Sequence, residues 1–164
     1  MATAAQNLSD HDPNSIPSAA SMKIAIVVAE WNAKITNGLL KGAEETLLKY
    51  GHSKTALQII HVPGSFELAN GAQMVLESQK VDAVICLGCV IQGETRHFDF
   101  VCQGLTQGIM DVSLQYKKPV IFGVLTDNNE QQSLDRSGGK HGNKGTEAAV
   151  TAIKMVALQK DLEA

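Results

Sequence analysis

Side chains that could bind or process a ligand occur in four short segments, each of which directly follows an apolar run. These segments are residues 31–32, 63–67, 92–97 and 126–128. They include the only tryptophan of the chain, Trp31, together with Glu67 and His97. An indole can stack on a flat heterocycle, a carboxylate can accept hydrogen bonds from a polyol, and an imidazole can exchange protons near neutral pH. If the segments meet in space, they form one candidate site.

Each of these three residues also has a plain structural explanation. Trp31 could cover the edge of a sheet, and Glu67 could complement the dipole of a helix that it opens. A lone histidine before a helix is often a cap or a surface residue. Taken one at a time, the residues leave both explanations open.

A phosphate group could bind at Gly93-Glu94-Thr95, which lies between an apolar run and a helical pattern that starts near His97. Glycine lets backbone N–H groups approach a ligand, the N-terminus of a helix favours an anion, and the Thr95 hydroxyl could donate to a phosphate oxygen. An ordinary strand-to-helix turn capped by Thr95 explains the same residues equally well.

Further cations stand in and beside residues 137–145, a stretch rich in glycine that is preceded by Arg136 and contains Lys140 and Lys144. It is not a Walker A segment, because the Gly-Lys-Ser/Thr ending is missing and no strand precedes it. Its composition alone favours a mobile, solvated connection.

The three cysteines predict no redox site. Cys86 and Cys89 form a Cys-x-x-Cys motif inside an apolar run that is typical of a strand. Residues three apart on a strand point to opposite faces of the sheet, and a redox pair needs the motif at the N-terminus of a helix. We therefore interpret them as small buried residues, and the odd count with Cys102 argues against a disulfide framework.

The pattern of apolar residues alternates between strands and helices along most of the chain. Continuous apolar runs predict strands, and apolar stripes at helical spacing predict helices. The predicted strands are 24–29, 56–62, 81–91 and 119–126, and the helices are 35–47, 68–79, 97–116, 130–136 and 146–160. Strict alternation predicts a parallel sheet with helices on both faces, so all four polar segments lie at the carboxyl edge of the sheet.

Outside this body, residues 1–22 are rich in Ala, Ser, Asn and Asp and predict an extended, flexible arm before one domain over 23–164. The net charge is −3. The chain lacks a basic block, an apolar run of the ~18 residues that span a bilayer, and a visible targeting signal. We expect a cytoplasmic protein that binds neither nucleic acid nor membrane.

Taken together, the motifs resemble those of the lumazine synthase family from about Lys23 to the C-terminus. Residues 62–68, Val-Pro-Gly-Ser-Phe-Glu-Leu, resemble the segment that binds the ribityl chain and the pyrimidine, and residues 88–99 resemble the segment for phosphate binding and proton transfer. Residues 119–126 and 136–145 resemble the two C-terminal segments, in the same order. Two departures are Ala69, where the family usually has proline, and Gln92, where it commonly has a basic residue.

The resemblance implies a three-layer, flavodoxin-like α/β sandwich with a four-stranded parallel sheet. It also implies a transferase that condenses 5-amino-6-(D-ribitylamino)uracil with 3,4-dihydroxy-2-butanone 4-phosphate to give 6,7-dimethyl-8-ribityllumazine, phosphate and water. This is the penultimate step of riboflavin biosynthesis, and it requires neither a cofactor nor a metal.

By the same resemblance, individual residues acquire roles. His97 would shuttle protons. The residues implied for the ribityl-pyrimidine are Trp31, Ser65, Phe66, Glu67, Val90, Ile91, Gln92 and, reaching in from a neighbouring subunit, Phe122. The residues implied for the butanone phosphate are Gly93, Glu94, Thr95, Arg136 and Lys144.

The partners implied are the two small-molecule substrates, further copies of the chain and riboflavin synthase. Members of the family form pentamers with active sites at subunit interfaces, and some pack the pentamers into an icosahedral shell.

Two rival functions are a catalytically silent, flavodoxin-like binding module and a shell subunit with a vestigial site. Formation of a fluorescent lumazine from the two substrates separates the enzyme from both.

Overall fold

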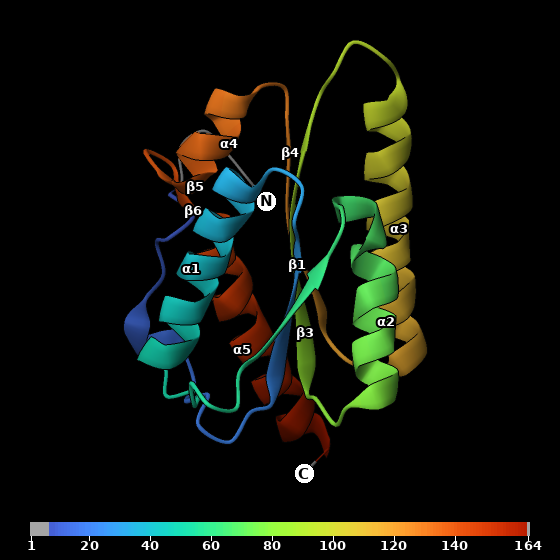
Figure 1. The fold of residues 1–164 in the computed structure, drawn as a ribbon. Helices are drawn as coiled ribbons and strands as arrows, with labels where there is room; N and C mark the ends of the chain where they lie inside the picture. Colours follow the sequence, from blue (N-terminus) through green and yellow to red (C-terminus); the bar gives the residue numbers. More distant parts are fainter. Residues whose placement is uncertain (1–6, 164) are drawn as a thin grey trace.

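A computed structural model describes residues 7–163 of the chain. Its centre is a sheet of four parallel strands in the order β2-β1-β3-β4 (Figure 1). The strands are β1 (Ile24–Ala29), β2 (Gln58–Val62), β3 (Ala83–Ile91) and β4 (Val120–Asp127). The predicted four-stranded parallel sheet is therefore confirmed, and β2 and β4 are its edges.

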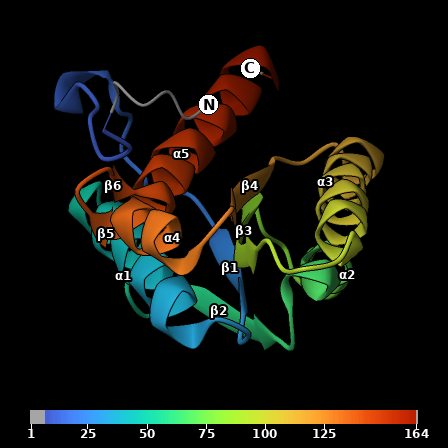
Figure 2. The same ribbon diagram turned by 90° about the horizontal axis from the view of Figure 1, so that it is seen from above.

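Helices cover both faces of the sheet, which makes the three-layer, flavodoxin-like sandwich that was expected. Two helices, α2 (Leu68–Ser78) and α3 (His97–Tyr116), lie on one side of the sheet (Figure 2). On the other side lie α1 (Ala33–Lys49), α4 (Glu130–Arg136) and α5 (Lys144–Glu163).

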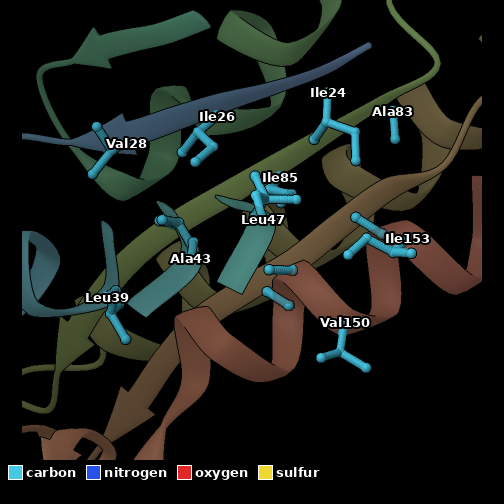
Figure 3. Packing of buried hydrophobic residues seen from close by; sticks show 14 of the residues in the cluster. Ile24, Ile26, Val28, Leu39, Ala43, Leu47, Ala83, Ile85, Val150 and Ile153 are labelled. Carbon is cyan, nitrogen blue, oxygen red and sulfur yellow. The ribbon is translucent and has the colours of Figure 1, made fainter. Parts of the chain in front are cut away.

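The apolar run of β1 is continuous because both faces of this strand are covered. Ile24, Ile26 and Val28 point toward α1 and α5 and share a buried cluster with Ile85 of β3 (Figure 3). The alternate residues of β1 lie in a second cluster on the α2 and α3 side. Alternate side chains of a strand face opposite ways, so one strand contributes to two cores.

The prediction of a loop over residues 137–145 was wrong, because these residues form two short strands and the start of a helix. A short antiparallel hairpin joins β5 (Ser137–Gly139) to β6 (Gly142–Asn143), and α5 then begins at Lys144, two residues before the predicted start. The Asn143 side chain fixes this junction. Its Oδ1 accepts from the Gly145 N–H at 2.8 Å, and its Nδ2 donates to the Gly38 carbonyl at 2.8 Å.

Residues 7–22 of the predicted arm lie across the layer of α1 and α5 (Figure 2). Ile16, Ala19 and Met22 are buried there. The His11 ring nitrogen Nε2 is 2.8 Å from the Tyr50 hydroxyl oxygen, at the end of α1. This part of the arm packs closely on the body. The first six residues of the predicted arm lie outside the described residues, and the division into arm and domain stays a prediction.

The two cysteines of the Cys-x-x-Cys motif lie on opposite faces of β3, as predicted. Cys86 packs in the cluster beside α2 and α3, and Cys89 packs in the cluster beside α1. Burial raises the pKa of the Cys86 thiol to about 12 and that of the Cys89 thiol to about 11. Both groups are therefore protonated and shielded at physiological pH.

This arrangement predicts the order in which a thiol reagent labels the native protein. At about pH 8, an aromatic disulfide reagent should react first with Cys102, which is partly exposed, because only an accessible thiolate attacks. Cys86 and Cys89 should react only after denaturation, which mass spectrometry of the labelled peptides can follow. Rapid joint loss of the Cys86 and Cys89 thiols under mild oxidation would instead support a redox pair.

Candidate functional site

Three of the four predicted polar segments, 31–32, 63–67 and 92–97, contribute to a pocket of about 340 Å³ at the carboxyl end of the sheet. We call it the Trp31 pocket. Segments that follow β1, β2 and β3 contribute to it, together with the first turn of α3. Its lining residues are Trp31, Asn32, Gly64, Ser65, Phe66, Glu67, Cys89, Val90, Ile91, His97 and Val101.

Trp31 is held at this pocket by the turn between β1 and α1. The backbone N–H of Trp31 donates to the Pro63 carbonyl at 3.1 Å. The next residue, Asn32, adopts a left-handed conformation with φ 61°, and its Nδ2 donates to the Cys89 carbonyl at 3.0 Å. The indole itself is 72% exposed. An exposed tryptophan on a fixed backbone is suited to stacking on a flat ring.

Ser65 is buried, and its hydroxyl already has partners. Its Oγ accepts from the Cys89 N–H at 3.1 Å and donates to the Cys89 carbonyl at 3.4 Å. The hydroxyl thus ties the turn η2 (Ser65–Glu67) to β3. The neighbouring side chains of Phe66 and Glu67 remain exposed at the pocket, so they are the groups of this segment that a ligand can reach directly.

Residues 92–96 form an exposed loop between β3 and α3 that arches over the end of the sheet (Figure 1). The N-cap residue of α3 is Arg96, without a side-chain cap hydrogen bond, so Thr95 does not cap this helix. The His97 N–H instead donates to the Thr95 Oγ1 at 3.3 Å, within the turn. Its hydroxyl hydrogen can still be donated to a ligand. A Cβ atom at Gly93 would lie more than 4 Å from every atom other than those of its chain neighbours, which leaves space beside this backbone.

A second pocket, of about 360 Å³, lies along the edge strand β4. We call it the Arg136 pocket. It is lined by Leu8, Phe122, Val124, Leu125, Thr126, Asp127, Arg136 and Lys144. Arg136 ends α4, where its Nη1 donates to the Gln132 carbonyl at 2.9 Å. Lys144 begins α5, where its Nζ lies 2.8 Å from the Glu147 Oε1.

The structure therefore divides the predicted site residues between two pockets. His97 and the residues that follow β1 and β2 line the Trp31 pocket, whereas Phe122, Arg136 and Lys144 line the Arg136 pocket. Gln92, Gly93, Glu94 and Thr95 line neither pocket and stay in the exposed loop. Sequence reasoning missed Leu8, because an arm rich in small polar residues carries no pattern that marks one leucine as part of a site.

Within residues 7–163, no group of three or more His, Cys, Asp or Glu side chains is placed to hold a metal ion. In the same range, no helix combines the length and apolar character that crossing a bilayer requires.

Known proteins are similar to this chain over almost its whole length. The sequence profile described as 6,7-dimethyl-8-ribityllumazine synthase matches residues 21–160. The protein of that name from Flavobacterium johnsoniae is 60% identical over 97% of this chain and 84% of its own length. Those from Parabacteroides distasonis and Cytophaga hutchinsonii are 58% and 57% identical, over 95% and 96% of this chain and 98% of their own lengths. The chain thus belongs to the 6,7-dimethyl-8-ribityllumazine synthase family.

Proposed function

We propose that the chain condenses 5-amino-6-(D-ribitylamino)uracil with 3,4-dihydroxy-2-butanone 4-phosphate, forming 6,7-dimethyl-8-ribityllumazine and releasing phosphate and water. The observation that carries the proposal is the Trp31 pocket, which places an exposed indole, a carboxylate and an imidazole together in a chain of this family. The direct test is to incubate the purified protein with both substrates and follow lumazine fluorescence. A binding module or a vestigial shell subunit would give no product.

In the Trp31 pocket, the pyrimidine ring stacks on Trp31 with Phe66 beside it. The Glu67 carboxylate accepts hydrogen bonds from ribityl hydroxyls, and the ring edge meets the backbone of residues 90–92. His97 lies at the same pocket, where it can accept or donate a proton as bonds to the substrate amine form and break.

The butanone phosphate binds to the remaining predicted site residues. Arg136 and Lys144 supply positive charge, and the loop of Gly93, Glu94 and Thr95 supplies backbone N–H groups and a hydroxyl. An arginine fork matches two phosphate oxygens at once, and a charge-assisted hydrogen bond is stronger than a neutral one.

The chemistry asks little of the protein beyond placement. The primary amine of one substrate attacks the carbonyl carbon of the other, and one water leaves as the imine forms. Phosphate is then eliminated with its bonding electrons, which leaves an enol that tautomerises to a second carbonyl. The second amine attacks that carbonyl, and loss of a second water completes the ring. Because the nucleophile and the leaving group belong to the substrates, the protein contributes mainly orientation and a charged environment for the departing phosphate.

One copy of the chain holds its two pockets apart, and we propose that a neighbouring copy completes each site. Phe122 lies on β4, an edge strand of the sheet where another subunit can approach, and Arg136 at the end of α4 lines the same pocket. On α3, Phe100, Met110 and Leu114 are 64%, 55% and 69% exposed and project toward the same side of the helix. Exposed apolar surface of this kind is typical of protein contacts. The cytoplasmic location, the shell and the association with riboflavin synthase remain predictions.

A shared site predicts that two impaired variants rescue one another. His97→Ala and Arg136→Ala should each have low activity at subsaturating butanone phosphate. After joint unfolding and reassembly, about a quarter of the sites would combine an intact His97 with an intact Arg136 from a neighbour. Activity should then rise well above the mean of the two variants.

The measurement is lumazine formation before and after mixing, with particle mass recorded to confirm that both samples assemble. Wild-type protein taken through the same procedure controls for recovery. If the activity stays at the mean of the two variants, each site uses His97 and Arg136 of one and the same subunit, and the shared site is contradicted.

A further inference from the structure

The hairpin of β5 and β6 connects the two cations of the Arg136 pocket. Arg136 is the last residue of α4 and directly precedes β5, whereas Lys144 directly follows β6 as the first residue of α5. The conformation and position of this hairpin therefore determine the backbone positions of Arg136 and Lys144. Contacts that fix the hairpin also fix these two backbone positions.

On one side, the hairpin rests directly on α1. The Asn143 Nδ2 donates to the Gly38 carbonyl at 2.8 Å. A Cβ atom at Gly38 would lie 2.6 Å from the Ser137 carbonyl oxygen, and one at Gly42 would overlap the Asn143 side chain. Glycines on α1 thus let the hairpin approach to backbone contact.

On the other side, the hairpin is held by the first described residues of the arm. The Leu8 N–H donates to the His141 carbonyl at 2.8 Å, and the Asn143 N–H donates to the Ser9 Oγ at 3.0 Å. Gly142 has φ +81°, and a Cβ atom there would overlap the Asn7 side chain and lie 2.7 Å from the Ser9 nitrogen. The arm and α1 therefore clamp the hairpin between them.

Leu8 also reaches the pocket itself. Its side chain is 8% exposed and lines the Arg136 pocket together with Phe122, Arg136 and Lys144. An apolar wall next to cations excludes water and strengthens their attraction for an anion.

We propose that Leu8 and Ser9 are positioning residues for the phosphorylated substrate. Ser9 fixes the hairpin through Asn143, and Leu8 closes the pocket beside the cations that flank the hairpin. This inference rests on the proposed function, because it assigns the Arg136 pocket to the phosphate. It gives the N-terminal arm a part in substrate binding.

The test compares Ser9→Ala, which removes the hydroxyl, with Ser9→Thr, which keeps it. Ser9→Ala should raise the KM for the butanone phosphate about three- to tenfold, the effect of one lost hydrogen bond. The KM for the ribityl-pyrimidine should not change, and Ser9→Thr should behave like the wild type. The double variant Leu8→Ala/Ser9→Ala should raise the KM by about tenfold or more.

Tyr50→Phe serves as the matched control. It removes the hydroxyl that contacts the His11 Nε2 and so loosens the arm, but it leaves in place the hairpin contacts and the 2.8 Å contact between the His11 Nδ1 and the Ser9 carbonyl. Its melting temperature should fall while both KM values stay at the wild-type level. Hydrogen exchange at the backbone amide of Asn143 adds a second readout, which should be faster in Ser9→Ala and unchanged in Tyr50→Phe.

Two outcomes would overturn the proposal. The first is a wild-type KM in both Ser9→Ala and the double variant although Arg136→Ala raises that KM. The second is an equal rise of that KM in Ser9→Ala and Tyr50→Phe. Failure of the wild-type protein to form any lumazine would instead remove the proposed function on which the inference rests.

Discussion

Replacing Arg136 by alanine should raise the KM for 3,4-dihydroxy-2-butanone 4-phosphate by about ten- to a hundredfold. The reason is the loss of a charge-assisted contact to the phosphate from a half-buried guanidinium at the Arg136 pocket. The KM for the ribityl-pyrimidine should barely move, because the groups proposed to bind it line the other pocket. Steady-state kinetics with each substrate varied in turn provide the measurement.

Lys140→Ala is the matched control for the change in charge. Lys140 lies in the same hairpin region, is 67% exposed and pairs with Asp135 at 3.0 Å, but it does not line the Arg136 pocket. Its removal should leave both KM values unchanged. Because Arg136 also donates to the Gln132 carbonyl at the end of α4, the melting temperature must be compared as well. A similar rise of both KM values would point to a structural role for Arg136.

The fold could be predicted from the sequence because its signals are periodic. The apolar run of β1 and the stripe of Leu105, Ile109 and Val112 on α3 are consequences of burial, and these residues are indeed buried. Alternating strands and helices leave few possible topologies, and the parallel sheet then brings the polar segments to one edge. For this reason, Trp31, Glu67 and His97, which the sequence places at one edge of the sheet, all line the Trp31 pocket.

The hairpin of β5 and β6 and the division of the site could not be predicted, because they depend on contacts between residues far apart in the chain. Such contacts leave no periodic pattern in the sequence. The hairpin forms because Asn143 bonds to Gly38 and Ser9, across separations of 105 and 134 residues. Likewise, a buried Ser65 hydroxyl bound to Cys89 cannot be distinguished in the sequence from one that faces a ligand. The division of the site between two pockets follows from the place of β4 at the sheet edge, and single segments do not reveal that place.

Replacing His97 by alanine should lower kcat by about a hundredfold or somewhat less, near the lower limit for a positioned acid–base group. The substrates bring their own nucleophile and leaving group, and water or buffer can replace part of the proton transfer because His97 is exposed at the start of α3. Binding of the ribityl-pyrimidine should survive, since Trp31, Phe66 and Glu67 remain. His61→Ala, which removes an exposed histidine of β2 outside the Trp31 pocket, should leave kcat unchanged.

The pH–rate profile distinguishes proton transfer from mere placement of the helix start. With saturating substrates, the pH dependence of the rate should differ between the wild type and His97→Ala, because a group that transfers a proton contributes to the profile and a residue that only begins a helix does not. A basic buffer such as imidazole should partly restore the variant rate in proportion to its concentration, because a small base can enter the space that the side chain vacates. If His97→Ala kept the wild-type rate and profile, His97 would only begin α3, and the proton carrier would have to be sought among the substrate's own groups.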